Sequence, residues 1–251
     1  MRPGGVLLAL LLLAPLTACG DGGDARYDVL VFSRTTAFRH AAAIEAGRAE
    51  LRRLGEERGF AVEATEDPER FSAEGLRDVD VVVLLQTNGP GVLRGGQRTA
   101  LQRWTRAGGG VVAIHAAANA DRDWPWYGEL LGGARFRNHP PGRLQFQRAT
   151  VTVEDPSHPA TRGLPARWQR TDEWYNFAPE PGPRARVLAT LDEREYQEAD
   201  GTAAADPHPI AWWTALGRGR SLYTALGHGA EAWEEPAYRS HVLGAVEWAA
   251  R

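Results

Sequence analysis

Short apolar runs recur along the first half of the chain and are separated by amphipathic or polar stretches. The runs at 27–32, 60–65, 79–86 and 111–114 are almost wholly apolar. Such runs are typical of strands in a parallel sheet that is covered on both faces. The pattern therefore predicts a sheet with a buried centre.

The stretches between these runs have helical periodicity. Residues 44–54 place apolar side chains at helical spacing, and Gly59 follows where a helix-ending glycine belongs. A second helix is expected over 93–104, stopped by glycines 108–110, and a short capped helix over 72–76. Alternating strands and helices predict a doubly wound, mainly parallel α/β fold.

The second half of the chain has a different pattern. Strands are expected at 144–154, 185–191, 210–216 and 221–226, joined by turns, and a closing helix at 236–250. Strands that follow one another without helices pair antiparallel. We therefore expect additional antiparallel strands beside the parallel sheet.

The N-terminus has the anatomy of a targeting segment. Arg2 supplies a positive start, residues 6–13 an apolar run, and Leu-Thr-Ala-Cys at 16–19 resembles a bacterial lipobox. The apolar run is shorter than the about 20 residues that a transmembrane helix needs. An ordinary signal peptide with an accidental cysteine is the alternative, and in the lipobox interpretation Cys19 is the lipidation site.

These features divide the chain into three parts. Residues 1–18 are expected to be a lipoprotein signal peptide, 19–26 a polar tether and 27–251 one α/β domain. The protein would then be exported and anchored in the membrane by its lipid, facing outside the cytoplasm.

Composition excludes several kinds of chemistry. Cys19 is the only cysteine, so the domain has no disulfide, thiolate zinc site or nucleophilic cysteine. The sequence contains no lysine, which excludes a Walker lysine and a lysine Schiff base. The formal net charge is −3, and no basic face suited to nucleic acid stands out.

Ligands of open parallel sheets bind at the carboxyl ends of the strands. Four loops of this chain are expected there, at residues 33–40, 86–91, 115–119 and 227–233. Three of them carry a histidine, namely His40, His115 and His228. Histidines also cap helices and fill cores, but three at one predicted edge favour a functional site.

Several segments, in order and at consistent spacing, resemble the ThuA (trehalose utilisation) family. They are 37–40 (AFRH), 109–115 (GGVVAIH), 127–136 (YGELLGGARF), 139–140 (HP), 158–165 (HPATRGLP), 172–175 (DEWY), 208–212 (HPIAW) and 219–228 (GRSLYTALGH). The resemblance covers most of 27–248. It implies a flavodoxin-like fold of the class I glutamine amidotransferase type and a role in carbohydrate catabolism, including routes through 3-keto sugars.

His115 occupies a special place in that fold. It follows the strand at 111–114 at a tight bend with small neighbours, where amidotransferases of this architecture carry a cysteine. An imidazole there carries protons or binds metal instead. Without a thiolate, a glutamine amidotransferase is excluded, and no serine has the G-x-S-x-G context of a hydrolase.

The first functional hypothesis is an enzyme acting on a glycoside or keto-sugar, with His115 and Glu173 as proton-transfer groups. Adjacent residues of an extended segment point to opposite sides, so only one of Asp172 and Glu173 can face the site. We name Glu173. The alternative is that this acidic pair is a surface feature.

The sequence also offers ligands for a divalent cation. His40, His115, Glu173 and His228 would form a nitrogen and oxygen set suited to Zn²⁺ or a similar ion. No compact H-E-x-x-H spacing supports it. His139, His158 and His208 each precede proline, which favours turns over ligation.

Polar and aromatic loop residues are the candidates for sugar binding, because aromatic faces stack on sugar C–H surfaces. The candidate substrate-binding set is His40, Asn88, Asn119, Trp124, Trp174, His208 and His228. The alternative is that the tryptophans anchor long loops. The competing class of function is a non-catalytic lipoprotein that binds a sugar or an envelope partner.

Overall fold

The computed structural model describes Met1 and residues 26–197 and 208–251. Apart from Met1, the predicted signal peptide lies outside these residues, as do Cys19 and the predicted tether up to residue 25. Within them, no helix is both long and apolar enough to cross a membrane.

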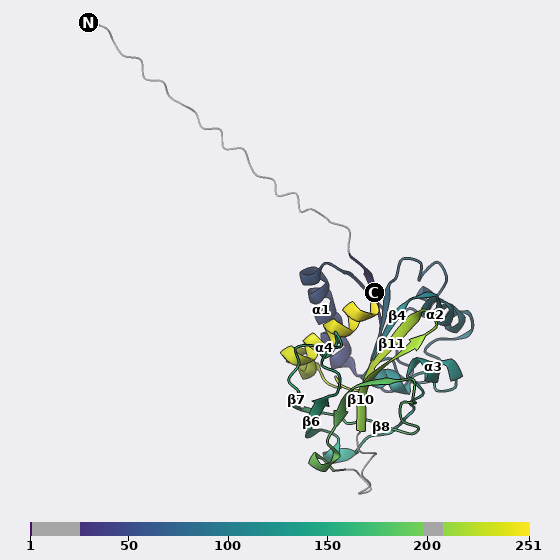
Figure 1. The fold of residues 1–251 in the computed structure, drawn as a ribbon. Helices are drawn as coiled ribbons and strands as arrows, with labels where there is room; N and C mark the ends of the chain where they lie inside the picture. The colour runs from purple at the N-terminus through teal and green to yellow at the C-terminus, as the bar shows by residue number, and fades with distance from the viewer. Residues whose placement is uncertain (2–25, 198–207) are drawn as a thin grey trace.

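One mixed sheet organises the described residues (Figure 1). Its parallel half has the order β2 (Ala61–Thr65), β1 (Asp28–Phe32), β3 (Val81–Leu85), β4 (Gly110–Ile114) and β11 (Gly219–Thr224). Its antiparallel half continues through β10 (His208–Leu216), β9 (Arg186–Leu191), β6 (Gln147–Val153) and β7 (Arg167–Asp172). A separate small sheet pairs β5 (Phe136–Asn138) with β8 (Asn176–Phe177).

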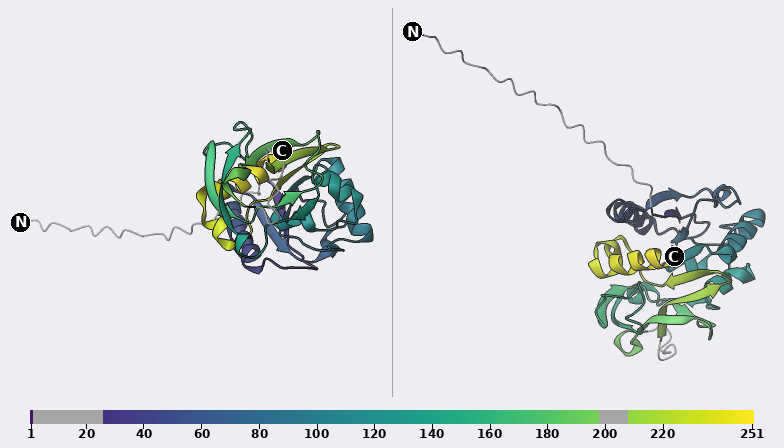
Figure 2. Two further views of the ribbon diagram at one scale, coloured as in Figure 1. Left: turned by 90° about the horizontal axis from the view of Figure 1, so that it is seen from below. Right: turned by 45° about the horizontal axis from the view of Figure 1, so that its top comes forward.

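Helices cover both sides of the parallel half (Figures 1 and 2). They are α1 (Ala41–Arg58) and α4 (Pro236–Ala249) on one side, and α2 (Gly95–Ala107) and α3 (Pro125–Leu130) on the other. Short 3₁₀ helices occupy several loops: η1 (Pro68–Arg70), η2 (His115–Asn119), η3 (Gly142–Leu144), η4 (Glu193–Glu195) and η5 (Ala230–Glu234). The predicted doubly wound fold with added antiparallel strands is confirmed.

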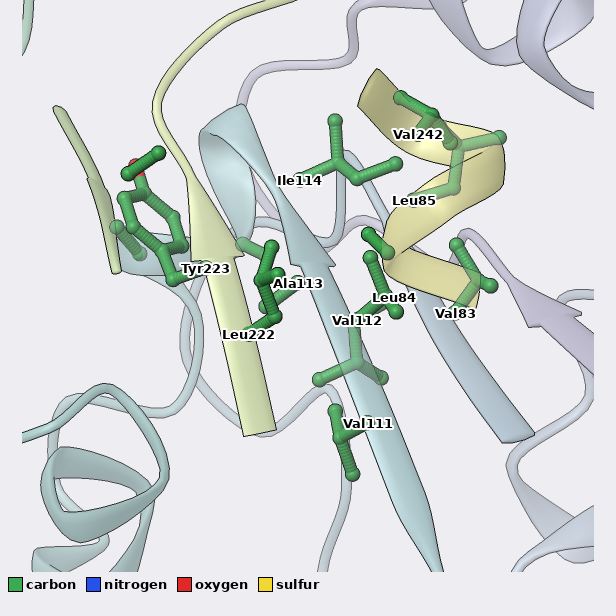
Figure 3. Close-up of a cluster of buried hydrophobic side chains, with 14 of the residues drawn as sticks. Val83, Leu84, Leu85, Val111, Val112, Ala113, Ile114, Leu222, Tyr223 and Val242 are labelled. Carbon is green, nitrogen blue, oxygen red and sulfur yellow. The ribbon is translucent and has the colours of Figure 1, made fainter. Parts of the chain in front are cut away.

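The core lies where α4 meets the centre of the sheet. Val83, Leu85 and Ile114 point toward Val242 of α4, whereas Tyr223 points to the opposite side (Figure 3). All five are buried, which is why strands β3 and β4 read as continuous apolar runs. Because β1, β3, β4 and β11 run parallel, their carboxyl ends lie at one edge of the sheet.

One predicted element is wrong, one strand begins later than expected, and one strand is missed. The segment 72–76 forms turns rather than a helix. The Ser72 hydroxyl accepts the backbone N–H of Gly75 as a helix cap does, but the later bonds, from Arg77 to Glu74 and from Val79 to Leu76, are those of turns. The strand predicted from Leu144 begins only at Gln147, since the preceding residues form η3. Strand β7 is missed, because its residues alternate in burial without being apolar.

Candidate functional site

The site lies at the carboxyl end of β4, where His115 begins η2. His115 has a φ of 50°, in the left-handed region that non-glycine residues seldom adopt. The Tyr223 hydroxyl donates to the His115 carbonyl at 3.0 Å, and Gln86 accepts the N–H of Ala116 at 3.3 Å. These contacts stabilise the bend that points the imidazole along the edge of the sheet.

The His115 ring is fully buried but lies among polar groups. Its Nδ1 is 2.6 Å from the carbonyl oxygen of Ala225, so Nδ1 carries a proton and donates it. Its Nε2 faces Glu173 Oε2 at 3.1 Å and His228 Nδ1 at 3.1 Å. The Tyr175 ring packs against it with a centroid distance of 4.2 Å.

Glu173 receives contacts on both carboxylate oxygens. His228 Nδ1 lies 2.9 Å from Oε2, and Gln145 donates to Oε1 at 2.6 Å. His139 Nδ1 is 3.2 Å from Oε1. Burial alone would raise the pKa of this carboxyl, but hydrogen bonds and charge from His115 and His228 lower it below its usual range. The carboxylate is therefore ionised at neutral pH.

His40 completes the cluster from the residue that precedes α1. Its ring lies edge-on to those of His228 and His115, with centroid distances of 4.6 and 5.3 Å. Its Nδ1 is buried without a hydrogen-bond partner among the described residues. Burial, followed by the neighbouring histidines, lowers the pKa of His40 to about 3, so this ring is neutral.

Asp172 organises the loop that carries His228. Its carboxylate accepts the backbone N–H groups of Gly227 at 2.8 Å, His228 at 3.1 Å and Glu173 at 2.9 Å. The buried Arg170 guanidinium pairs with Asp172 at 3.0 Å. Glu173 faces the histidines while Asp172 holds the backbone around them.

The predicted asparagines tie the site loops together. Asn119 donates to the Asn88 side chain at 2.9 Å, and Asn88 donates to the Phe38 carbonyl at 2.9 Å. These contacts join the loops after β1, β3 and β4. The two amides are placed to hold the loop containing His40, and direct ligand contact stays a prediction.

Two of the other predicted sugar contacts, Trp174 and His208, are packed inside the fold. Trp174 is fully buried and His208 nearly so, because His208 bonds the Tyr175 carbonyl from inside the fold. Trp124 is half-buried against Trp126, and Arg98 covers it. A face already packed inside the protein cannot stack on a sugar, so Trp174 anchors its loop, whereas sugar contact by the half-buried Trp124 stays a prediction.

Sequence reasoning missed four residues of this region. Phe38 and Phe146 are 67% and 48% exposed, and apart from Met1 they are the exposed large hydrophobic residues of the described part of the chain. Their rings lie 4.9 Å from His40 and 4.8 Å from His228. The other two are Gln145 and His139. The sequence signals were the segments 37–40 (AFRH), which contains Phe38, and 139–140 (HP), whose histidine was expected to lie in a turn.

A second surface hollow lies away from the histidine cluster. Arg106, Glu129, Arg184 and Gly217 are among its lining residues. Since α2 ends beside it, this hollow lies at the amino ends of the parallel strands, opposite the histidines. We therefore place the candidate site at the histidine cluster.

The fold and site define an α/β protein of the glutamine amidotransferase-like fold with an imidazole and carboxylate centre at its strand ends. The chain belongs to the ThuA family, described as trehalose utilisation, whose sequence pattern matches residues 28–249. That family suggests a carbohydrate-related role. No curated protein matches the sequence significantly.

Solved structures agree with this assignment. A ThuA-like protein from Bacteroides uniformis ATCC 8492 is 26% identical, with a TM-score of 0.77 over 90% of this chain and 91% of that one. A ThuA-like protein from Parabacteroides merdae ATCC 43184 is 20% identical, with a TM-score of 0.68 over 89% and 90% of the two chains. The second likeness shows the fold alone.

Proposed function

We propose that this protein acts on a carbohydrate, by proton transfer at the cluster of His115, Glu173 and His228. The observation that carries the proposal is that two imidazole nitrogens lie within 3.1 Å of the same carboxylate oxygen. A carboxylate beside an imidazole stabilises the protonated ring, so the pair accepts and returns protons. Membership of the ThuA family supports carbohydrate as the substrate class.

A 3-keto glycoside suits this chemistry. Its carbonyl makes the hydrogen on C2 acidic, and a base that removes it forms an enolate. Elimination then breaks the bond between C1 and the glycosidic oxygen, which leaves with a proton, and water later adds across the C1–C2 double bond. Each step needs one proton taken or given, which the cluster can supply.

The exposure of the histidines supports an order for them in the proposed reaction. His115 is fully buried, whereas the side chain of His228 is 14% exposed. His228 therefore faces the ligand, and His115 with Glu173 forms the inner pair that holds or shares its proton. Exposed Phe38 and Phe146 flank the rings and offer apolar faces for a sugar.

The N-terminal sequence adds a location to the proposal. Export followed by lipidation of Cys19 would tether the domain to a membrane through residues 20–26, on the outer side of the cytoplasmic membrane. Metabolic labelling with a palmitate analogue tests this, with Cys19→Ala as the control. Loss of label in that variant supports the anchor, and equal label in both forms contradicts it.

The reaction is tested with the purified full-length protein and a 3-keto disaccharide in D₂O. Release of free sugar and deuterium at C2, followed by NMR, are the expected results. His228→Ala and Glu173→Gln should remove both signals, and His158→Asn, outside the cluster, should keep them. A protein that binds the disaccharide but neither exchanges nor cleaves it would instead be a binding lipoprotein.

A further inference from the structure

Three side-chain atoms of the cluster, His115 Nε2, Glu173 Oε2 and His228 Nδ1, lie close together. Too few protons are available for a hydrogen bond between each pair of them. His115 Nδ1 donates its proton to the Ala225 carbonyl, so in the neutral ring Nε2 carries a lone pair. That lone pair faces Glu173 Oε2, which only accepts. His228 Nδ1 has one proton at most to offer the two of them.

A positive charge at the centre resolves this conflict. Two lone pairs about 3 Å apart repel unless a proton or a metal ion lies between them. The distances of 2.9, 3.1 and 3.1 Å join His228 Nδ1, Glu173 Oε2 and His115 Nε2 into a near-regular triangle. A single proton can bridge only one side of it.

We propose that this cluster is a binding site for a divalent cation of the zinc class, with His40, His115, Glu173 and His228 as ligands. One ligand atom of each lies within 4.8 Å of the other three. Ligands of tetrahedral zinc are about 2.1 Å from the ion, and hence roughly 3.4 Å from one another. The triangle's sides of 2.9 to 3.1 Å are somewhat shorter than that spacing, and the His40 ligand atom lies within 4.8 Å of the other three.

His40 gives independent support. It is 93% buried, since its exposed fraction is 7%, yet its Nδ1 has no hydrogen-bond partner among the described residues. A buried nitrogen without a hydrogen-bond partner costs free energy. Coordination of a bound ion by the His40 ring would remove that cost. Three imidazoles and one carboxylate form a donor set that favours Zn²⁺ over Mg²⁺ or Ca²⁺.

The surroundings of the ligands fit a metal site. Metal-binding histidines usually donate their second ring N–H to a carbonyl or carboxylate, as His115 does to Ala225. The ligating carboxylate is held too, because Gln145 donates to Glu173 Oε1 and leaves Oε2 for the centre. Asp172 fixes the backbone of both His228 and Glu173.

This inference rests on the proposed function only for the substrate, and it changes the roles within the cluster. With an ion bound, His115, His228 and Glu173 are ligands, and the ion stabilises negative charge that develops on the sugar. His139 stays outside the ligand set and its side chain is 32% exposed. Its Nδ1 lies 3.1 Å from the Pro140 carbonyl, which leaves Nε2 free to accept a proton.

The test measures metal binding without any sugar. The purified full-length protein is stripped with chelator, and Zn²⁺ alone is titrated by calorimetry, with elemental analysis of the dialysed complex. We expect about one ion per chain with a dissociation constant of about 1 μM or lower. Co²⁺ in place of Zn²⁺ should give a visible absorption spectrum typical of four or five ligands.

Variants identify the ligands. His115→Ala, Glu173→Gln and His228→Ala should each weaken Zn²⁺ binding by about 100-fold or more. His158→Asn is the matched control, because His158 lies outside the cluster and Asn can still accept the Ala160 N–H that its Nδ1 binds. Circular dichroism of the stripped variants checks that they are folded, and Glu173→Gln, which keeps the side chain's shape, serves if an alanine variant is not.

Two results would overturn the inference. One is a stripped protein that binds neither Zn²⁺ nor Co²⁺, and the other is binding that persists unchanged in Glu173→Gln and His115→Ala. Turnover of the 3-keto disaccharide by metal-free protein would remove the ion from the reaction and leave the proposed function standing. Tight Zn²⁺ binding without turnover would keep the metal site and remove the proposed reaction.

Discussion

The carboxylate of Asp172 accepts the backbone N–H of His228 at 3.1 Å, although the two residues are 56 positions apart. Asp172 ends β7 in the antiparallel half of the sheet, and His228 follows β11 of the parallel half. This bond connects the two halves at the site. The negative charge of Asp172 strengthens this bond. The buried Arg170 guanidinium pairs with that charge inside the protein.

Replacement of Asp172 by Asn should therefore destabilise the fold and loosen the His228 loop. The variant keeps its shape but leaves the Arg170 guanidinium with only the more distant Glu235, at 3.6 Å. Removing one partner of a buried ion pair costs about 3 kcal/mol. Urea unfolding measures the loss, and Glu57→Gln, in an exposed helical pair with Arg53, should leave the unfolding midpoint unchanged.

A double-mutant cycle isolates the pair. Asp172→Asn combined with Arg170→Met should cost less than the sum of the two single changes, because no uncompensated charge then stays buried. Strict additivity would show that the two side chains act independently and would refute this account.

The backbone at His115 makes a second prediction. Its φ of 50° suits glycine and is unfavourable for a β-branched side chain. His115→Val should thus be less stable than His115→Gly by about 2 kcal/mol. Both variants lack the imidazole, so the difference between their urea unfolding curves is the backbone cost less the stability gained by burying the valine side chain. A valine variant as stable as the glycine variant would mean that the bend relaxes.

A further prediction concerns how Phe38 and Phe146 affect sugar affinity. Because both rings are exposed, Phe38→Ala and Phe146→Ala should leave the unfolding free energy nearly unchanged. Loss of a stacking face of about 1.4 kcal/mol would raise the KM or Kd for a disaccharide about tenfold. Phe146→Tyr, which keeps the ring, should bind normally. Unchanged affinity in both alanine variants would place the sugar elsewhere.

Two buried histidines outside the site predict how stability depends on pH. Burial lowers the pKa of His241 to about 4, against the partly compensating Ala160 carbonyl, and burial lowers that of His158 to about 4 as well. Both rings are neutral in the folded protein. As pH falls from about 6.5 to 4, the unfolded chain takes up protons that the folded chain does not, so folding stability decreases.

Each histidine contributes up to about 1.4 kcal/mol per pH unit within that window and nothing above it. Melting temperatures measured between pH 7.5 and 4.5 should therefore fall progressively below pH 6.5. The fall should be shallower in His158→Asn, which cannot take up the proton. An identical pH profile for the variant and the parent protein would contradict the assignment of His158.

The sequence by itself determined the architecture. Its apolar runs identified β1 to β4, and glycine at position 59 marked the end of α1, where it adopts a φ of 74°. These features are local, because a strand covered on both faces must be apolar and a left-handed helix end favours glycine. Strand direction then placed His40, His115 and His228 at one edge.

Only the tertiary structure decided which residues surround those histidines. Trp174 lies in a predicted connection and is buried. Phe146 lies near the start of a predicted strand and is exposed. Gln145 and His139 reach Glu173 from 28 and 34 positions away, across β6 and β7. Such contacts depend on how the antiparallel half folds back over the strand ends, and no periodicity along the chain encodes that distance.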